Sequence, residues 1–134
     1  MATLRLEVVT PEKTVVSEDV DMVMCPGSEG EFGILPHHVS LLSALKIGPL
    51  RYRINDRDEL VFISGGFVDM HADTCSVLAE TAEKAQDIDD ARAKQAKERA
   101  EARLAEKKEE VDETRAVLAL QRAVMRLKIA QRNI

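Results

Sequence analysis

Four arginines in the last third of the chain have the side-chain type and the spacing to bind an anion. Arg92 and Arg99 are seven residues apart, and Arg122 and Arg126 are four apart, so each pair shares one face of a helix if its segment is helical. If a turn brings two such helices together, four guanidinium groups converge, and their mutual repulsion favours an anion between them. Arginine forks suit phosphate in particular. The alternative is that these arginines form a solvent-exposed helix face whose positive charge is balanced by neighbours such as Glu98.

Other residues with reactive side chains lack supporting context. His37, His38 and His71 have no carboxylate or cysteine spacing that would complete a set of metal ligands. The glycines of residues 27–33 lack the Gly-Lys-Ser/Thr ending of a phosphate loop, and we interpret them as tight turns. No Ser–His–Asp or Cys–His arrangement stands out. The sequence therefore predicts no catalytic residues and no metal.

Composition excludes several classes of protein. The chain has 134 residues, of which 45% are hydrophobic and 32% charged, enough for a packed core. A net charge of −5 and an aromatic content of 3% argue against a nucleic-acid partner. No stretch approaches the ~18 apolar residues of a membrane-spanning helix, and the first residues do not have the pattern of a signal peptide. Cys25 and Cys75 are expected to be buried, reduced thiols, with a disulfide as the alternative.

Glycine and proline divide the chain into two parts. All six glycines and all four prolines lie within the first 66 residues. Because these residues mark turns and break helices, the first part is expected to be rich in turns and the second helical. We expect two domains, residues 1–84 and residues 85–134.

The first part has the period-two alternation of β-strands. It runs through residues 4–8, 20–24 and 50–54, and the even-numbered residues of 20–24 are expected to face the core. Residues 55–58 predict a hairpin turn, and residues 64–66 (Ser-Gly-Gly) predict a further turn. Short strands between turns indicate an antiparallel β-sandwich or flattened barrel of roughly eight to ten strands with an aliphatic core.

The second part has the period of amphipathic helices. Asp87 or Asp89 is expected to cap a first helix, and Asp112 a second one, with a turn near residues 107–112. One apolar stripe in each helix is expected to pack against the other: Ala93, Ala96, Ala100 and Leu104, and Ala116, Leu120, Ala123 (or Val124), Leu127 and Ala130. The second domain is therefore predicted to be an antiparallel two-helix hairpin.

Such a hairpin is held together weakly. Alanine buries little area, so at ~25 cal/mol per Å² the seam contributes only a few kcal/mol before entropy is subtracted. The same residues form helix well throughout. A single helix over residues 87–132 would span roughly 70 Å. The sequence fits a conformational switch between a closed hairpin and an extended arm, and also an ordinary helical appendage.

Several separate motifs resemble the ε subunit of bacterial F-type ATP synthase. They are residues 31–36 (Glu-Phe-Gly-Ile-Leu-Pro) followed by His38 and the leucines of 41–42, residues 63–67 (Ile-Ser-Gly-Gly-Phe), and residues 78–83 (Leu-Ala-Glu-Thr-Ala-Glu). The order of the motifs and the division into a sandwich and two helices match along the whole chain. The δ subunit of mitochondrial relatives shares this fold.

The resemblance implies a non-catalytic subunit of the central rotor stalk. It implies a sandwich that contacts the γ subunit and the membrane c-ring and helps to couple rotation to proton flow. It also implies a helical domain that extends into the ring of catalytic α and β subunits and blocks ATP hydrolysis. It implies that the subunit is bound peripherally at the cytoplasmic face of the bacterial inner (plasma) membrane. Opposite charge would hold the inserted helix to an acidic segment of β; the residues implied are Arg115, Arg122, Arg126 and Lys128.

A further motif implies regulatory ATP binding. Apart from this ATP, no cofactor is expected. Residues 88–93 (Ile-Asp-Asp-Ala-Arg-Ala) resemble the motif of ε subunits that bind ATP on the closed hairpin. The nucleotide-binding residues implied are Glu83, Ile88, Asp89, Arg92, Arg99, Arg122 and Arg126. ATP bound there would stabilise the hairpin and oppose its extension. The alternatives are a stand-alone cytosolic adaptor with the same two domains, and a small β-barrel enzyme.

Overall fold

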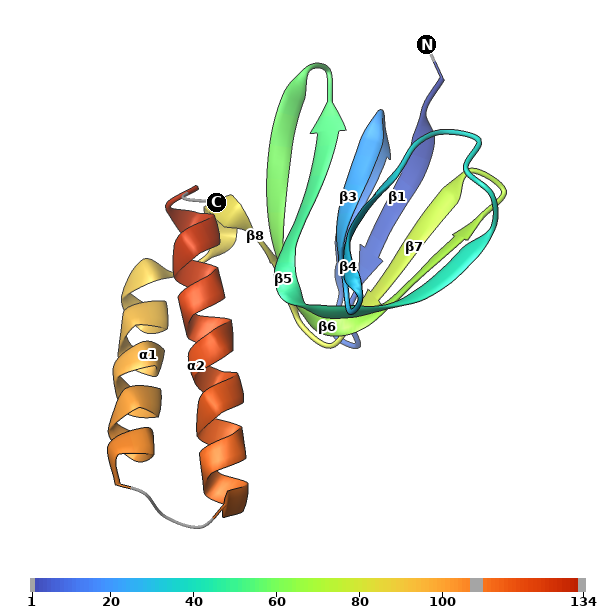
Figure 1. Cartoon of the computed structure of the whole chain (residues 1–134). Helices are drawn as coiled ribbons and strands as arrows, with labels where there is room; N and C mark the ends of the chain where they lie inside the picture. The colour runs from blue at the N-terminus through green and yellow to red at the C-terminus, as the bar shows by residue number, and fades with distance from the viewer. Residues whose placement is uncertain (1, 107–109, 133–134) are drawn as a thin grey trace. The chain divides into compact units, whose positions relative to one another are not determined.

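The computed structural model describes residues 2–106 and 110–132, and its contacts divide the chain into two units, which we describe separately (Figure 1). The first unit, Met1–Lys84, contains β1 (Leu4–Val9), β2 (Thr14–Val20), β3 (Met22–Gly27), β4 (Gly30–Ile34), β5 (Leu41–Ile54), β6 (Arg57–His71), β7 (Thr74–Ala79) and β8 (Ala82–Lys84). The second unit, Ala85–Ile134, contains the short 3-10 helix η1 (Ala85–Asp87), α1 (Asp90–Ala105) and α2 (Glu110–Ala130).

The strands form one sheet that folds over its own core. Its order is β2-β1-β7-β6-β5-β3-β4, and β8 pairs with β6. The long strands β5 and β6 bend strongly (Figure 1), which lets one sheet supply both layers. All pairs are antiparallel except β1 and β7, which run parallel. The prediction of an N-terminal β-sandwich followed by two helices is confirmed.

The core of the strand unit is aliphatic, as predicted. Leu4, Leu6 and Val8 of β1 are at most 1% exposed. Cys25 and Cys75 are free and buried in the same cluster, which confirms the prediction of reduced thiols. The neighbouring Cys75 thiol, followed by burial, raises the pKa of the Cys25 thiol, so this thiol stays protonated and unreactive at neutral pH.

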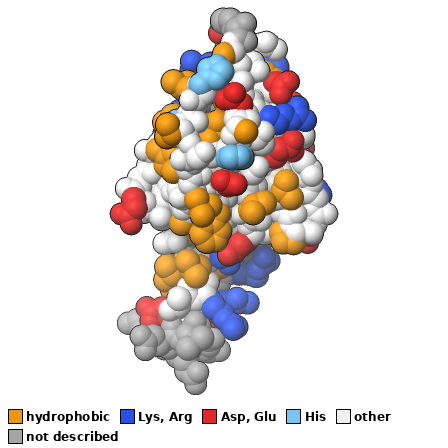
Figure 2. All heavy atoms as spheres, turned by 90° about the vertical axis from the view of Figure 1, so that its right-hand side faces the viewer, with side chains coloured by type: hydrophobic (Ala, Val, Ile, Leu, Met, Phe, Trp, Pro, Cys, Tyr) orange, Lys and Arg blue, Asp and Glu red, His pale blue; other side chains and the backbone are white. Residues whose placement is uncertain are grey.

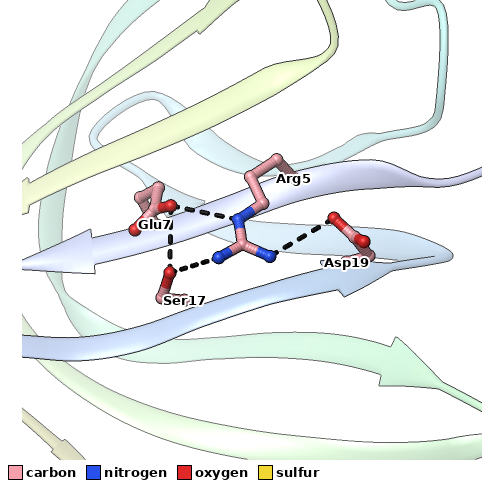
Figure 3. A network of polar contacts seen from close by, with 4 residues as sticks. All are labelled: Arg5, Glu7, Ser17 and Asp19. Atoms are coloured by element: carbon pink, nitrogen blue, oxygen red, sulfur yellow. Dashed lines mark hydrogen bonds and ion pairs between the residues drawn. The ribbon is translucent and has the colours of Figure 1, made fainter.

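Between the buried residues of β1, polar side chains lie on the outer face of the sheet (Figure 3). The Arg5 guanidinium donates to Glu7 at 3.1 Å, to Ser17 Oγ at 2.6 Å and to Asp19 at 3.4 Å. The contact with Glu7, and after it the contact with Asp19, raises the pKa of Arg5. The network ties β1 to β2 from the solvent side, which is the side that the period-two pattern assigns to polar residues.

The prediction for residues 20–24 is wrong beyond Val20. β2 ends at Val20 and β3 begins at Met22, with Asp21 between them. In β3 it is Val23 and Cys25 that are fully buried, whereas Met22 and Met24 are half-buried. One residue at a strand break exchanges the two faces, because side chains alternate strictly along a strand.

The predicted turn at residues 64–66 is also wrong, because β6 continues through it as Arg57–His71. Gly65 and Gly66 have φ of 119° and 135°, and they lie where β6 changes its partner from β8 to β7. A Cβ atom on Gly66 would lie 2.0 Å from the carbonyl oxygen of Leu78. The two glycines therefore bend a strand and admit a neighbouring backbone.

The hairpin predicted at residues 55–58 is confirmed. Asn55 and Asp56 form the turn between β5 and β6 with φ of 51° and 63°, as a two-residue hairpin of type I′ requires. Next to the turn, Arg53 Nε donates to Asp58 Oδ1 at 2.9 Å, and this bond lowers the pKa of Asp58.

In the second unit, α1 and α2 pack side by side as an antiparallel hairpin (Figure 1). Asp89 is the N-cap of α1, whereas Asp87 lies in η1. Helix α2 begins at Glu110, so Asp112 lies in its first turn and is not its N-cap. The rest of the predicted turn, residues 107–109, lies outside the described residues.

The seam between the helices is built from alanine, as predicted. Ala93 and Ala100 of α1 and Ala116 and Ala123 of α2 are at most 3% exposed. Ile129, which the predicted stripe did not include, is also fully buried. Within the part of the chain that is described, no helix has the length and apolar character needed to cross a membrane.

Candidate functional site

Each buried alanine of the hairpin seam follows an arginine directly. The pairs are Arg92–Ala93, Arg99–Ala100, Arg115–Ala116 and Arg122–Ala123. Because one residue corresponds to about 100° of rotation, all four arginines lie on the same flank of their helices relative to the seam. In two antiparallel helices that face each other, the residues one position before the seam residues point to the same face of the hairpin. The four arginines therefore share one face.

A groove on the opposite face supports this assignment independently. It has a volume of about 450 Å³, and its lining includes Lys94, Glu101 and Val124, the residues that directly follow three of the buried alanines. The residues that directly follow the buried alanines in the sequence thus meet on one face of the hairpin, from both helices. The arginines, which directly precede these alanines, therefore lie on the other face. Val124 lines this groove, so of the two alternatives for the apolar stripe, Ala123 is the seam residue.

Two more arginines belong to the same face. Arg103 lies four residues after Arg99, and Arg126 lies four residues after Arg122, so each continues the row of its helix. We call the six residues the arginine face: Arg92, Arg99, Arg103, Arg115, Arg122 and Arg126. Arg103 was not predicted from the sequence to be a site residue, and Arg115 was predicted only for the inhibitory contact. The repeated Arg-Ala dipeptide was the signal that could have identified Arg115.

Much of the charge on the arginine face has no local partner. Within residues 2–106 and 110–132, the guanidinium groups of Arg92, Arg99, Arg115 and Arg122 make no ion pair and no hydrogen bond. Arg92, Arg99 and Arg115 are exposed, and Arg122 is half-buried. Like charges gathered without counter-ions favour an anion, and exposed guanidinium groups can donate to it bidentately.

The other predicted site residues divide between the two units. Glu83 lies half-buried on β8 in the first unit. In the second unit, Ile88 is half-buried between η1 and α1, and Asp89 accepts a hydrogen bond from the backbone N–H of Arg92 at 3.1 Å. Lys128, predicted with Arg115, Arg122 and Arg126 as an inhibitory contact, lines the groove on the face opposite these arginines.

The strand unit has a row of apolar side chains on its outer surface. Phe67 and Leu78 lie directly opposite each other on β6 and β7, and they are 56% and 58% exposed. The same row continues to Ala44 on β5 and to Val9 on β1. Leu42, two residues from Ala44 on the same face of β5, is 73% exposed. We call these five residues the apolar row; Leu42, Phe67 and Leu78 are its exposed members. Large exposed apolar patches are a common feature of protein–protein contacts.

Together, the sandwich and the hairpin define a two-domain protein with an exposed apolar row on one part and an arginine-rich face on the other. Residues 3–85 match the family described as ATP synthase, Delta/Epsilon chain, beta-sandwich domain, and residues 86–131 match the long alpha-helix domain of the same chain. The chain belongs to the ATP synthase delta/epsilon chain family, which consists of non-catalytic subunits.

Relatives with the name ATP synthase epsilon chain are similar over most of the chain. The one from Syntrophobacter fumaroxidans is 56% identical over 129 residues, which cover 96% of each chain. The one from Nitratidesulfovibrio vulgaris (strain DP4) is 56% identical over 101 residues, 75% of each chain. That from Dehalococcoides mccartyi (strain BAV1) is 50% identical over 102 residues, 76% of this chain and 73% of the relative.

Two solved structures share the fold. A chain in the mitochondrial ATP synthase of Euglena gracilis (OSCP/F1/c-ring) has a TM-score of 0.77 at 22% identity, covering 90% of this chain and 77% of that chain. A chain in the central stalk and c-ring of the mitochondrial ATP synthase of Tetrahymena thermophila has a TM-score of 0.64 at 19% identity, covering 94% and 95%.

Proposed function

We propose that the chain is the ε subunit of the central stalk of a bacterial F-type ATP synthase, which couples proton-driven rotation to ATP synthesis. The relative that is 56% identical over 96% of the chain and is named ATP synthase epsilon chain supports this assignment. In this function the sandwich binds the γ subunit and the membrane c-ring. The apolar row around Phe67 and Leu78 supplies a contact surface for γ, because exposed apolar side chains gain stability when a partner buries them. The subunit would lie peripherally at the cytoplasmic face of the inner membrane.

The helical unit is proposed to inhibit ATP hydrolysis by extending into the ring of α and β subunits. The observation that carries this proposal is the alanine seam with arginines along it. Ala93, Ala100, Ala116 and Ala123 bury little apolar area, so only a small free energy holds the helices together. Opening the seam turns α2 into an arm that presents Arg115, Arg122 and Arg126 to an acidic segment of β.

ATP is proposed to hold the hairpin closed. Closing the seam brings the arginines of both helices onto one face, which raises their mutual repulsion. A triphosphate on Arg92, Arg99, Arg122 and Arg126 removes that repulsion and binds only the closed form. ATP therefore shifts the population toward the closed hairpin by its differential affinity, and its depletion favours the inhibitory arm.

Truncation of the chain after Gln86 tests the inhibitory role. The truncated chain retains every strand of the sandwich and loses both α-helices. We expect the complex to assemble and pump protons, and to hydrolyse ATP faster than the complex with the full chain. Hydrolysis at the same rate in both assembled complexes would contradict the inhibitory role.

Co-purification separates this function from the stand-alone adaptor. A tagged full-length chain expressed from its own genome is expected to bring down γ together with the rest of the synthase. Recovery of the chain with a different protein and without γ would favour the adaptor. Turnover of a substrate by the isolated chain would favour the small β-barrel enzyme.

A further inference from the structure

One carboxylate connects two turns at one end of the sandwich. The first is the loop between β4 and β5, residues 35–40, and the second is the turn between β6 and β7 at residues 72–73. The backbone N–H of His37 donates to Oδ1 of Asp73 at 2.7 Å, and His37 Nδ1 lies 3.4 Å from Oδ2 of the same residue. The two residues are 36 positions apart in the chain.

The contact holds His37 in a conformation that a side chain disfavours. The backbone N–H of His38 donates to the carbonyl of Leu35 at 3.2 Å, so His37 is the third residue of a β-turn, after Pro36. Its φ is 65°, the left-handed region that a type II turn requires at this position and that glycine fills without strain. With histidine in that place, the turn gains its stability from the Asp73 carboxylate, through a charge-assisted hydrogen bond.

The loop held in this way presents apolar side chains to solvent. Leu35 is 57% exposed and Val39 is 76% exposed. The loop runs directly into β5, whose second residue is Leu42 of the apolar row. Figure 2 shows histidine side chains among exposed hydrophobic and acidic side chains on one face of this unit. Along the chain, the loop therefore leads directly into a strand of the surface that the proposed function assigns to γ.

We propose that Asp73 is a positioning residue for this surface: its carboxylate fixes the loop 35–40 so that Leu35 and Val39 extend the apolar row that binds γ. This inference rests on the proposed function. A loop that is ordered before binding loses less conformational entropy when the partner arrives, so a fixed loop binds more tightly than a loose one with the same side chains.

The chain contains a matched pair of turns for testing the contact. Asp73 and Asp56 are both the second residue of a two-residue turn, with φ of 60° and 63°. Asp→Gly suits the left-handed backbone at either position, so it removes the carboxylate without disturbing the turn itself. Asp73→Gly therefore removes the contact with His37, and Asp56→Gly is the control for the same change in another turn.

The first measurement is amide hydrogen exchange on the isolated full-length chain. In Asp73→Gly we expect the amides of residues 37–41 to exchange about tenfold faster, the factor for the loss of one charge-assisted hydrogen bond. In Asp56→Gly we expect these amides to exchange as in the unchanged chain. Equal protection of residues 37–41 in all three chains would overturn the proposal.

The second measurement is binding to an α3β3γ complex that lacks this subunit. We expect Asp73→Gly to bind about tenfold more weakly, Asp56→Gly to bind normally, and the double variant His37→Gly/Asp73→Gly to regain most of the loss, because glycine adopts the turn without the carboxylate. A loosened loop with unchanged affinity for the complex would overturn the positioning role. If the unchanged chain does not bind the complex, the proposed function is wrong, while the exchange measurement still decides whether Asp73 holds the loop.

Discussion

The Asp89 carboxylate accepts a hydrogen bond from the backbone N–H of Arg92 at 3.1 Å, so Asp89 caps the helix that carries the first arginine of the arginine face. The resemblance to ATP-binding ε subunits assigns Asp89 to the nucleotide site. A substitution there therefore changes the end of α1 and the proposed site together. Any test of Asp89 in nucleotide binding has to separate these two effects.

Asp89→Asn and Asp89→Ala make that separation. Asparagine is as good an N-cap as aspartate, so Asp89→Asn is expected to keep the helix content of the chain. Asp89→Ala is expected to cost about 1 kcal/mol of hairpin stability through the lost cap. Thermal melts followed by circular dichroism at 222 nm measure this difference. If Asp89→Ala melts at the same temperature as Asp89→Asn, the cap does not stabilise the hairpin.

The arginine face predicts how ATP stabilises the isolated chain. We expect ATP to raise the melting temperature, because a ligand that binds only the folded form stabilises it by mass action. Arg92→Ala and Arg126→Ala each remove a donor of the proposed site and are expected to abolish this rise. Differential scanning fluorimetry with and without ATP measures it.

Lys94→Ala provides the control for these arginine variants. Lys94 lies two residues from Arg92 on the same helix, but it lines the groove on the other face of the hairpin. The variant loses the same unit of positive charge as Arg92→Ala and is expected to keep the stabilisation by ATP. If Lys94→Ala also abolishes the rise in melting temperature, the stabilisation by ATP depends on the total charge of the hairpin, and ATP has no specific site on the arginine face.

The bend in β6 predicts the effect of a single methyl group. Gly66→Ala forces a φ of 135° on alanine and places its Cβ atom 2.0 Å from the carbonyl oxygen of Leu78. Gly30 has the same φ of 135°, but nothing lies within 4 Å of a Cβ atom built there. Both variants contain the backbone strain, about 1–3 kcal/mol, and only Gly66→Ala adds the clash. We expect Gly66→Ala to lower the urea midpoint clearly more than Gly30→Ala; equal midpoints would mean that the strand moves to accept the methyl group.

The sequence predicted best where one local pattern determines the result. The alanine stripes, the cap at Asp89 and the hairpin at Asn55–Asp56 each follow from spacing or turn chemistry within a few residues. The period-two pattern was less reliable, because residues 22–25 are all apolar and do not indicate that the break at Asp21 exchanges the two faces of the strand. The glycines at 65–66 fit a turn and a bend equally well, and only the position of β7 distinguishes them.

Long-range contacts had no signal in the sequence. His37 and Asp73 meet because β5, β6 and β7 bring two loops to the same end of the sandwich, and no local pattern connects positions so far apart. The spacing of the arginines predicted which of them share a helix face. Which face of the hairpin they share became clear only from the alanines that are buried and from the groove on the other side.

The alanine seam predicts that the closed hairpin tolerates no larger side chain between its helices. Ala100 is 2% exposed in the seam, whereas Ala102, on the same helix, is exposed. Ala100→Leu forces the helices apart at a cost of about 1–3 kcal/mol. Ala102→Leu adds the same atoms to α1 at a position that does not touch α2. In the assembled complex, Ala100→Leu is therefore expected to favour the extended arm, so that ATP hydrolysis falls and higher ATP concentrations are needed to restore it. Ala102→Leu is expected to behave like the unchanged chain. If Ala100→Leu hydrolyses ATP at the rate of Ala102→Leu at every ATP concentration, closure of the seam does not control the motor.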